Sequence, residues 1–274
     1  MFMAIMQAHK NILASQSADK TLKEWVAYFE NQYTKNQIYS WCYHNGYTIK
    51  KISDAERSKI QSQNARKYHI NENYFKTWTH NMAYILGYWW ADGCIYKGKM
   101  FDITTHAKDK YILKQMAKEL QYEGPIQDYV DRQAYRLNFS CVTIYRDIVA
   151  LGGKERKSLD ATFPQVPKEF LPDFIRGYFD GDGSVWYVKG GPRINSEFCS
   201  GSKDFLLSLW QILKEEVGIE GGNLHLSNAS CYELIFGKRD SIKLGSFMYK
   251  DNPELFLIRK SDKFKDFLEK DILH

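Results

Sequence analysis

Two aspartates, Asp92 and Asp182, stand near the end of two closely similar stretches of sequence. The first stretch reads Ile-Leu-Gly-Tyr-Trp-Trp-Ala-Asp-Gly over residues 85–93, and the second reads Ile-Arg-Gly-Tyr-Phe-Asp-Gly-Asp-Gly over residues 175–183. Carboxylates at equivalent positions of a repeat predict a site whose oxygens bind a hard divalent cation such as Mg²⁺. Such a site needs elements that bring the two aspartates together.

The residues before each aspartate have the spacing of a helix–helix contact. On a helix, residues four apart share a face, so Gly87 with Ala91 and Gly177 with Gly181 form two stripes of small residues. Two such stripes allow helix backbones to approach closely. The Asp-Gly pair is typical of a helix end, since glycine suits the left-handed position there. If the helices pack side by side in parallel, the two aspartates meet at their C-terminal ends.

This meeting is unfavourable without a cation. Two carboxylates would face each other where both helix dipoles are also negative. A divalent ion relieves the repulsion, and carboxylates, retained waters and substrate phosphate oxygens suit the octahedral shell of Mg²⁺. A single Asp-Gly would more simply be a cap and a turn. Two copies in one frame, each after a small-residue stripe, favour the metal site.

The pair of motifs resembles the two signature motifs of a LAGLIDADG homing endonuclease in its single-chain form. The resemblance implies a monomer that cleaves both strands of a long, asymmetric double-stranded DNA target, with one active site per strand. It implies in-line attack of a metal-activated water on the phosphodiester, with Mg²⁺ or another divalent cation such as Mn²⁺. The metal ligands that it implies are the carboxylates of Asp92 and Asp182 and the backbone carbonyls of Ala91 and Gly181.

The two copies differ at the motif's first acidic position, which is Trp90 in the first copy and Asp180 in the second. In the family the first acidic position does not bind the metal, so the difference does not exclude the DNA cleavage that the resemblance implies. The central helix pair is therefore expected to be asymmetric, with Trp89 and Trp90 packed in the core.

Two lysines are further catalytic candidates under the same resemblance. Arg-Lys-Ser occurs at residues 156–158 and again at residues 259–261. The family places a lysine there in each active site, so Lys157 and Lys260 are expected to stabilise developing negative charge. The alternative interpretation of each Arg-Lys pair is an exposed basic pair at the start of a helix, without a catalytic role. The polar groups expected to order water are those of Thr105 and Ser200.

An internal repeat extends beyond the motifs. Lys-Asp before an apolar helix occurs at residues 108–109 and 203–204, and strand-like alternation occurs at residues 135–139 and 232–236. Each half reads as helix, strand pair, helix, strand pair and terminal helices. We predict an α+β fold of two pseudo-symmetric αββαββα halves, whose antiparallel strands form, by the resemblance, a saddle that straddles DNA. The predicted domains are a helical N-terminal segment, residues 1–75, a first half, residues 76–163, and a second half, residues 164–274.

The N-terminal segment lies outside the resemblance. Apolar residues at helical spacing after Thr21, and a second pattern from Lys35 to His44, predict two short helices. Such a pair is compatible with a helix-turn-helix that enters the major groove, and equally with a plain packing module. The basic run from Lys50 to Lys67 is expected to be a linker that contacts phosphate.

The charge distribution bears on DNA binding. Residues 1–75 carry ten Lys/Arg and six Asp/Glu, which leaves 28 against 27 for the rest of the chain. DNA binding by the larger part therefore requires segregated charge. The expected DNA contacts are Lys97, Lys99, Lys189, Arg193, Lys50, Lys51, Arg66 and Lys67.

Composition narrows the class of protein. Hydrophobic residues make up 44% and aromatic residues 15% of the chain, which supports a substantial core. Five scattered cysteines without a Cys-x-x-Cys pair indicate reduced thiols in a cytosol-like compartment and argue against a zinc site. The expected location is cytoplasmic, with the nucleoid reached through DNA binding and an organellar host as the alternative. The sequence contains no run of about 18 apolar residues, so it predicts no membrane span.

Three other functions fit parts of the sequence. A DNA-binding regulator that lost cleavage is expected to lack the metal aspartates, and both are present. An intron RNA maturase can keep both motifs. An intein-borne domain is expected to end in Asn, whereas the chain ends in Ile-Leu-His. The endonuclease is the favoured interpretation, with the maturase and the inactive regulator as alternatives.

Overall fold

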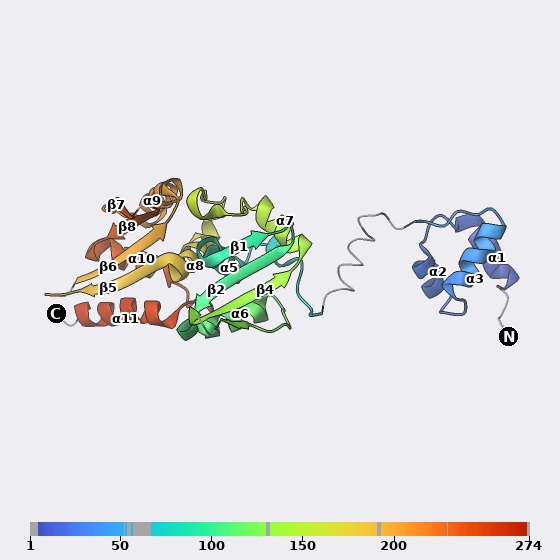
Figure 1. The fold of residues 1–274 in the computed structure, drawn as a ribbon, viewed down its shortest axis with the longest axis horizontal. Coiled ribbons are helices and arrows are strands. Elements are labelled where there is room, and N and C mark those ends of the chain that lie inside the picture. The colour runs from blue at the N-terminus through green and yellow to red at the C-terminus, as the bar shows by residue number, and fades with distance from the viewer. Residues whose placement is uncertain are drawn as a thin grey trace. The chain divides into compact units, whose positions relative to one another are not determined.

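The computed structural model describes residues 5–51, 53, 56, 67–129, 132–190, 193–228 and 230–272. The chain forms two compact units, Met1–Lys67 and Tyr68–His274. Figure 1 shows the elements of each unit. Among the described residues, no helix combines the length and the apolar character needed to cross a bilayer.

The described residues of unit 1 include the helices α1 (Gln7–Gln16), α2 (Leu22–Tyr28) and α3 (Lys35–His44). Thr21 and Thr34 begin α2 and α3 with capping boxes, in which the threonine hydroxyl and the side chain three residues later each accept a backbone N–H. These two helices confirm the prediction. The sequence analysis missed α1, which has a single buried residue, Leu13. The core of unit 1 also contains Trp25, Phe29, Tyr33, Ile38 and Cys42.

Unit 2 passes twice through the same order of elements. The first half contains α5 (His80–Asp92), β1 (Gly93–Tyr96), β2 (Met100–His106), α6 (Lys110–Glu119), β3 (Gln127–Tyr129), β4 (Ala134–Ser140) and α7 (Val142–Ala150). The second half contains α8 (Leu171–Asp182), β5 (Gly183–Val188), β6 (Arg193–Ser200), α9 (Lys203–Val217), β7 (Asn223–Asn228), β8 (Cys231–Phe236), α10 (Lys238–Met248) and α11 (Ile258–Ile272). Short 3-10 helices are η1 (Tyr74–Lys76), η2 (Ala107–Asp109), η4 (Lys157–Leu159) and η5 (Lys168–Phe170). The predicted α+β fold of two repeated halves is confirmed.

Each half builds one antiparallel four-stranded sheet. The strand orders, β1-β2-β4-β3 and β5-β6-β8-β7, are equivalent. Helices cover one face of each sheet, so alternate residues such as Phe101 and Ile103 on β2, and Ile194 and Phe198 on β6, are buried. Figure 1 shows the pair α5 and α8 between the two sheets. The opposite faces, which we call the open faces, carry partly exposed polar side chains such as Arg136 and Asn138 on β4 and Glu197 on β6.

Residues 68–75, which the sequence analysis grouped with the N-terminal segment, belong to unit 2. Ile70 and Phe75 are buried in the same core cluster as the central helices. The Asn71 N–H also donates to the carbonyl of Leu120, at the end of α6.

The central helices α5 and α8 are parallel and unusually close. Gly87 lies against the backbone of Phe174 and Tyr178, and Gly177 lies against the backbone of Tyr84 and Tyr88. A Cβ atom at either glycine would overlap a carbonyl oxygen of the other helix. One turn further along, Gly181 lies against the Cβ atom of Ala91. The two small-residue stripes therefore form the contact between the helices.

Gly93 and Gly183, which follow α5 and α8, do not form the left-handed helix caps that the sequence predicted. Gly93 and Gly183 have φ values of −106° and −101° with ψ near 160°, so they are extended and do not occupy a left-handed cap. The expectation of a left-handed cap is wrong, because each helix passes directly into a strand. Glycine is needed there for space, since a Cβ atom would overlap the Trp89 or Phe179 ring and lie 2.6 Å from the same residue's carbonyl oxygen.

Gly177→Ala tests the close contact of α5 and α8. The added methyl must push the helices apart or bend one of them, and overpacking of this kind costs about 2 kcal/mol or more. We expect a lower urea midpoint in equilibrium unfolding monitored by circular dichroism. Gly237→Ala is the control, because nothing lies within 4 Å of a Cβ at that position and its φ is −78°. Equal midpoints for the two variants would contradict the close contact.

Candidate active site

The C-terminal ends of α5 and α8 bring two carboxylates to one place. Asp92 and Asp182 are the last residues of these parallel helices. The Asp92 Oδ2 atom lies 3.4 Å from the position that a Cβ on Gly181 would occupy, so this carboxylate reaches the opposite helix. Asp92 is exposed on one side and Asp182 is half-buried. The end of the helix pair is therefore open to solvent but crowded by protein.

The environment of the two carboxylates resists ionisation. Desolvation by the surrounding protein and, second, the charge of Asp182 raise the pKa of Asp92 to about 7, against the opposing effect of Lys260 and Lys157. Burial also raises the pKa of Asp182. Lys260 favours ionised Asp92 more than Lys157 does, whereas the order is reversed for Asp182. Each lysine therefore acts more strongly on the carboxylate of the other half.

Both candidate lysines are buried at the ends of the central helices. The exposed fractions of Lys157 and Lys260 are 6% and 3%. Burial lowers the pKa of both ammonium groups to about 8. Cations at these positions offset the negative ends of the helix dipoles. The Nζ atoms donate to the carbonyl oxygens of Gly93 (2.7 Å) and Ala91 (3.4 Å) for Lys157, and of Phe179 (2.7 Å), Asp180 (2.7 Å) and Gly183 (2.6 Å) for Lys260.

The alternative of an exposed basic pair therefore does not apply to these lysines. Their neighbours Arg156 and Arg259 are the more exposed members of each Arg-Lys-Ser run. The catalytic role of the lysines stays a prediction, but the structure places both beside the candidate carboxylates.

A tyrosine of each motif lies beside the polar group expected to order water. The hydroxyl groups of Tyr88 and Thr105 are 2.8 Å apart and both side chains are buried. The Tyr178 hydroxyl donates to the carbonyl of Cys199, and the Ser200 hydroxyl accepts the N–H of Ser202. Sequence reasoning did not single out these tyrosines, although their place in the repeat could have indicated them.

The motif's first acidic position differs in structure as well as in sequence. The Asp180 carboxylate is buried and accepts the Tyr84 hydroxyl at 2.8 Å and the Leu257 N–H at 2.7 Å. In the first half, the indole N–H of Trp90 donates to the carbonyl of Thr162. Trp89 and Trp90 are both in the core, as predicted.

The expected DNA contacts in unit 2 lie at two equivalent turns. Lys97 and Lys99 belong to the exposed turn between β1 and β2. Lys189 and Arg193 flank the turn between β5 and β6 and are also exposed. Of the DNA contacts expected in unit 1, Lys50, Lys51 and Lys67 are exposed, whereas Arg66 lies outside the described residues.

The open faces carry polar groups that the sequence analysis missed. On the first sheet, Asp102 forms an ion pair with Arg136 and accepts the side-chain amide of Asn138 at 2.7 Å. On the second sheet, Glu197, Cys199 and Glu233 lie within 4.8 Å of one another. Strand alternation could have found these residues, because each occupies the face opposite the buried apolar residues of its strand.

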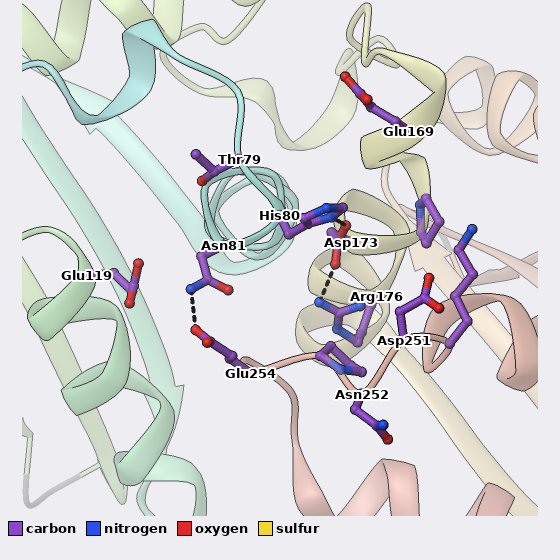
Figure 2. Close-up of a pocket in the computed structure, with 13 residues that line it drawn as sticks. Thr79, His80, Asn81, Glu119, Glu169, Asp173, Arg176, Asp251, Asn252 and Glu254 are labelled. Atoms are coloured by element: carbon purple, nitrogen blue, oxygen red, sulfur yellow. Dashed lines mark hydrogen bonds and ion pairs between the residues drawn. The ribbon is translucent and has the colours of Figure 1, made fainter.

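The opposite ends of the central helices form a separate polar pocket (Figure 2). The His80 ring and the Arg176 guanidinium both contact the Asp173 carboxylate at 2.7 Å. The Asn81 amide donates to Glu254 at 2.8 Å. These contacts tie the N-terminal end of α5 to the second half.

The donor set at the carboxylate end fits a hard divalent cation. Asp92 and Asp182 supply carboxylate oxygens, and burial raises the pKa of both groups in spite of the nearby lysines. The backbone carbonyl of Ala91 lies at the same end of the helix pair. The Lys157 ammonium contacts this carbonyl and that of Gly93. Oxygen ligands of this kind suit Mg²⁺ and Mn²⁺ rather than zinc.

A family model described as a LAGLIDADG-like domain matches residues 169–246, from η5 into α10. This part of the chain is similar to LAGLIDADG-like domains. The first half repeats its order of helices and strands, so the resemblance found in the sequence is confirmed. No curated protein sequence matches the chain significantly.

Solved structures of LAGLIDADG proteins are similar to the chain. The meganuclease I-AabMI, bound to uncleaved DNA, is 14% identical over 69% of this chain and 90% of its own, with a TM-score of 0.49. I-LtrWI, bound to its target DNA, is 14% identical over 74% and 91%, with a TM-score of 0.47. An I-DmoI variant with target DNA and manganese is 22% identical over 64% and 97%, with a TM-score of 0.44.

Asp92→Asn tests the electrostatic state of the two apposed carboxylates without metal. Because the folded pKa of Asp92 is about 7 and an unfolded aspartate has a pKa near 4, the folded state binds the proton more tightly. The wild type should therefore lose stability relative to Asp92→Asn as pH rises from about 4 to about 7. Above about 7, the difference should be constant.

Thermal melts in chelator at several pH values measure this difference. Asp266→Asn, on the exposed side of α11, is the control and should follow the wild type. A difference between Asp92→Asn and wild type that does not change with pH would contradict the raised pKa.

Proposed function

We propose that this protein is a site-specific endonuclease that makes double-strand breaks in a long DNA target and requires a divalent metal ion. The observation that carries the proposal is the convergence of Asp92 and Asp182 at the end of two parallel helices. The similarity of residues 169–246 to LAGLIDADG-like domains supports the nuclease class. DNA is the partner named for the similar solved structures, and double-stranded DNA is the proposed substrate.

Asp92 and Asp182 would hold the metal, together with the backbone carbonyls of Ala91 and Gly181. Mg²⁺ is the proposed ion and Mn²⁺ the proposed substitute. A divalent ion bound there lowers the pKa of a water molecule and stabilises charge on the phosphodiester oxygens. The protein's part is to fix the carboxylates, and the glycine contacts between α5 and α8 do so through rigid backbone.

Lys157 and Lys260 would stabilise the negative charge that grows on the phosphate. With pKa values of about 8, both remain largely ammonium at pH 7. All three protons of Lys260 are directed to carbonyl oxygens, so its main effect is that of a fixed charge at the site. No protein nucleophile is required, because the attacking group is water.

The open faces of the two sheets would lie in the major groove of the DNA. The turn residues Lys97, Lys99, Lys189 and Arg193 stand at equivalent edges of these faces and would contact phosphate or base edges. Unit 1 would add phosphate contacts through Lys50, Lys51, Lys67 and Arg66. The protein is proposed to act as a monomer, because the chain itself supplies both halves.

Asp182→Asn and Asp92→Asn test the proposed function directly. Each removes one charged ligand, so we expect at least about 100-fold slower cleavage of a target plasmid in Mg²⁺, since metal-assisted charge stabilisation is worth several kcal/mol. Binding of target DNA should stay within about threefold of the wild type, because the carboxylates do not attract phosphate. The target is obtained by selecting cleaved members of a randomised plasmid library. Cleavage at the wild-type rate by either variant would contradict the assignment of Asp92 and Asp182 as metal ligands.

Lys157→Met and Lys260→Met separate charge stabilisation from DNA binding. A positioned cation acts on charge that grows in the transition state, and the loss of one such group costs roughly 3 kcal/mol, or on the order of 100-fold in rate. Methionine keeps the length of the buried side chain. Single-turnover cleavage rates and dissociation constants for the same target are compared. Equal losses in rate and affinity would assign the lysines to phosphate positioning instead.

A further inference from the structure

The segment that carries Lys260 is held by an ion pair between the two halves. Arg259 donates from Nε to both carboxylate oxygens of Asp109, at 3.1 and 3.0 Å, and from Nη2 to Oδ2 at 2.9 Å. Asp109 belongs to η2 of the first half and is only 3% exposed. A forked contact of this kind fixes orientation as well as distance.

A tyrosine from the same region of the first half holds the same segment. The Tyr111 hydroxyl, on α6, accepts the N–H of Ile258 at 2.7 Å and donates to the carbonyl of Phe256 at 3.2 Å. Asp109 and Tyr111 thus contact residues 256–259 through both side chain and backbone. We call these contacts, from Asp109 and Tyr111 to residues 256–259, the cross-half clamp.

The second half holds the segment from its other side. The Arg176 guanidinium donates to the carbonyl of Leu255 at 2.9 Å, and Asp180 accepts the N–H of Leu257 at 2.7 Å. Lys260 comes directly after this segment in the sequence and is the third residue of α11. Its ammonium position therefore depends on contacts from both halves.

The first half has no equivalent of the clamp. Arg156 matches Arg259 in the repeat, but it is exposed and has a left-handed backbone with φ of +57°. Asp204 matches Asp109 and is also exposed, and within the described ranges these two residues form no ion pair. Leu206 takes the place of Tyr111 and has no hydroxyl. Lys157 is therefore held without this ion pair and without a tyrosine bridge.

We propose that Asp109 and Tyr111 are positioning residues for Lys260, so that one of the two active sites depends on the clamp and the other does not. This inference rests on the proposed function. Lys260 donates to carbonyl oxygens of Asp180 and Gly183, which flank the end of α8 at Asp182, so the clamp joins Asp109 and Tyr111 of the first half to the carboxylate end of the helix pair. Loosening the clamp should slow cleavage of one DNA strand and spare the other.

The test measures each strand separately. Single-turnover cleavage of a duplex target, labelled on one strand at a time, is followed for Tyr111→Phe, Asp109→Asn and Asp109→Glu. We expect about tenfold slower cleavage of one strand in Tyr111→Phe and Asp109→Asn, a rate within twofold for the other strand, and accumulation of nicked plasmid. Asp109→Glu keeps a carboxylate for Arg259 and should recover part of the rate.

Two variants serve as matched controls. Arg156→Ala removes the arginine that matches Arg259 in the repeat but forms no ion pair with Asp204. Asn81→Ala removes a cross-half hydrogen bond to Glu254 at the far end of the helix pair (Figure 2). Both should cleave the two strands as the wild type does. Equal slowing of both strands in Tyr111→Phe and Asp109→Asn, or no slowing of either, would overturn the proposal.

A second measurement does not depend on cleavage. Amine labelling with acetic anhydride, read by mass spectrometry, reports the accessibility of each lysine in the full chain. In Tyr111→Phe and Asp109→Asn, Lys260 should be labelled at least about fivefold faster, with Lys157 unchanged. If the wild type cuts neither strand in Mg²⁺ or Mn²⁺, the proposed function fails and the labelling still decides the clamp: unchanged labelling of Lys260 overturns it.

Discussion

The structure of unit 2 depends on the close parallel contact of α5 with α8. Gly87 and Gly177 admit the backbone of the opposite helix, and no side chain separates the two. Parallel packing has an electrostatic cost, because the negative ends of both helices and two carboxylates share one place. The raised pKa of Asp92, the buried positions of Lys157 and Lys260 and the fit to a divalent cation all follow from that contact.

Two different kinds of contact complete the two halves around this shared pair. The Asp180 carboxylate is buried and accepts the Leu257 N–H, whereas Trp90 occupies the matching position and donates to the carbonyl of Thr162. Arg259 is paired with Asp109, whereas Arg156 is exposed. A single chain can vary its two halves independently, so repeated elements need not give equal sites. An asymmetric DNA target suits such a protein.

The sequence predicted the repeated fold well because each half carries its own periodic pattern and because the motifs recur in one frame. It also predicted the small-residue stripes, since a four-residue spacing is local. It could not predict the extended conformation of Gly93 and Gly183, which depends on strands that begin without a loop. It missed the pair of Arg259 with Asp109, because residues 150 positions apart meet only after the halves dock. The weak apolar pattern of α1 also escaped prediction.

We propose above all that α5 and α8 hold Asp92 and Asp182 together as ligands of one metal centre. Titration of the full chain with Mn²⁺ at pH 8, where Asp92 is ionised, tests it by the loss of the free-ion signal in electron paramagnetic resonance. The account predicts that Asp92→Asn and Asp182→Asn each weaken Mn²⁺ binding by at least about tenfold, because one hard oxygen ligand loses its charge. Asp266→Asn should bind as the wild type does. Equal Mn²⁺ affinity in all four proteins would contradict the account.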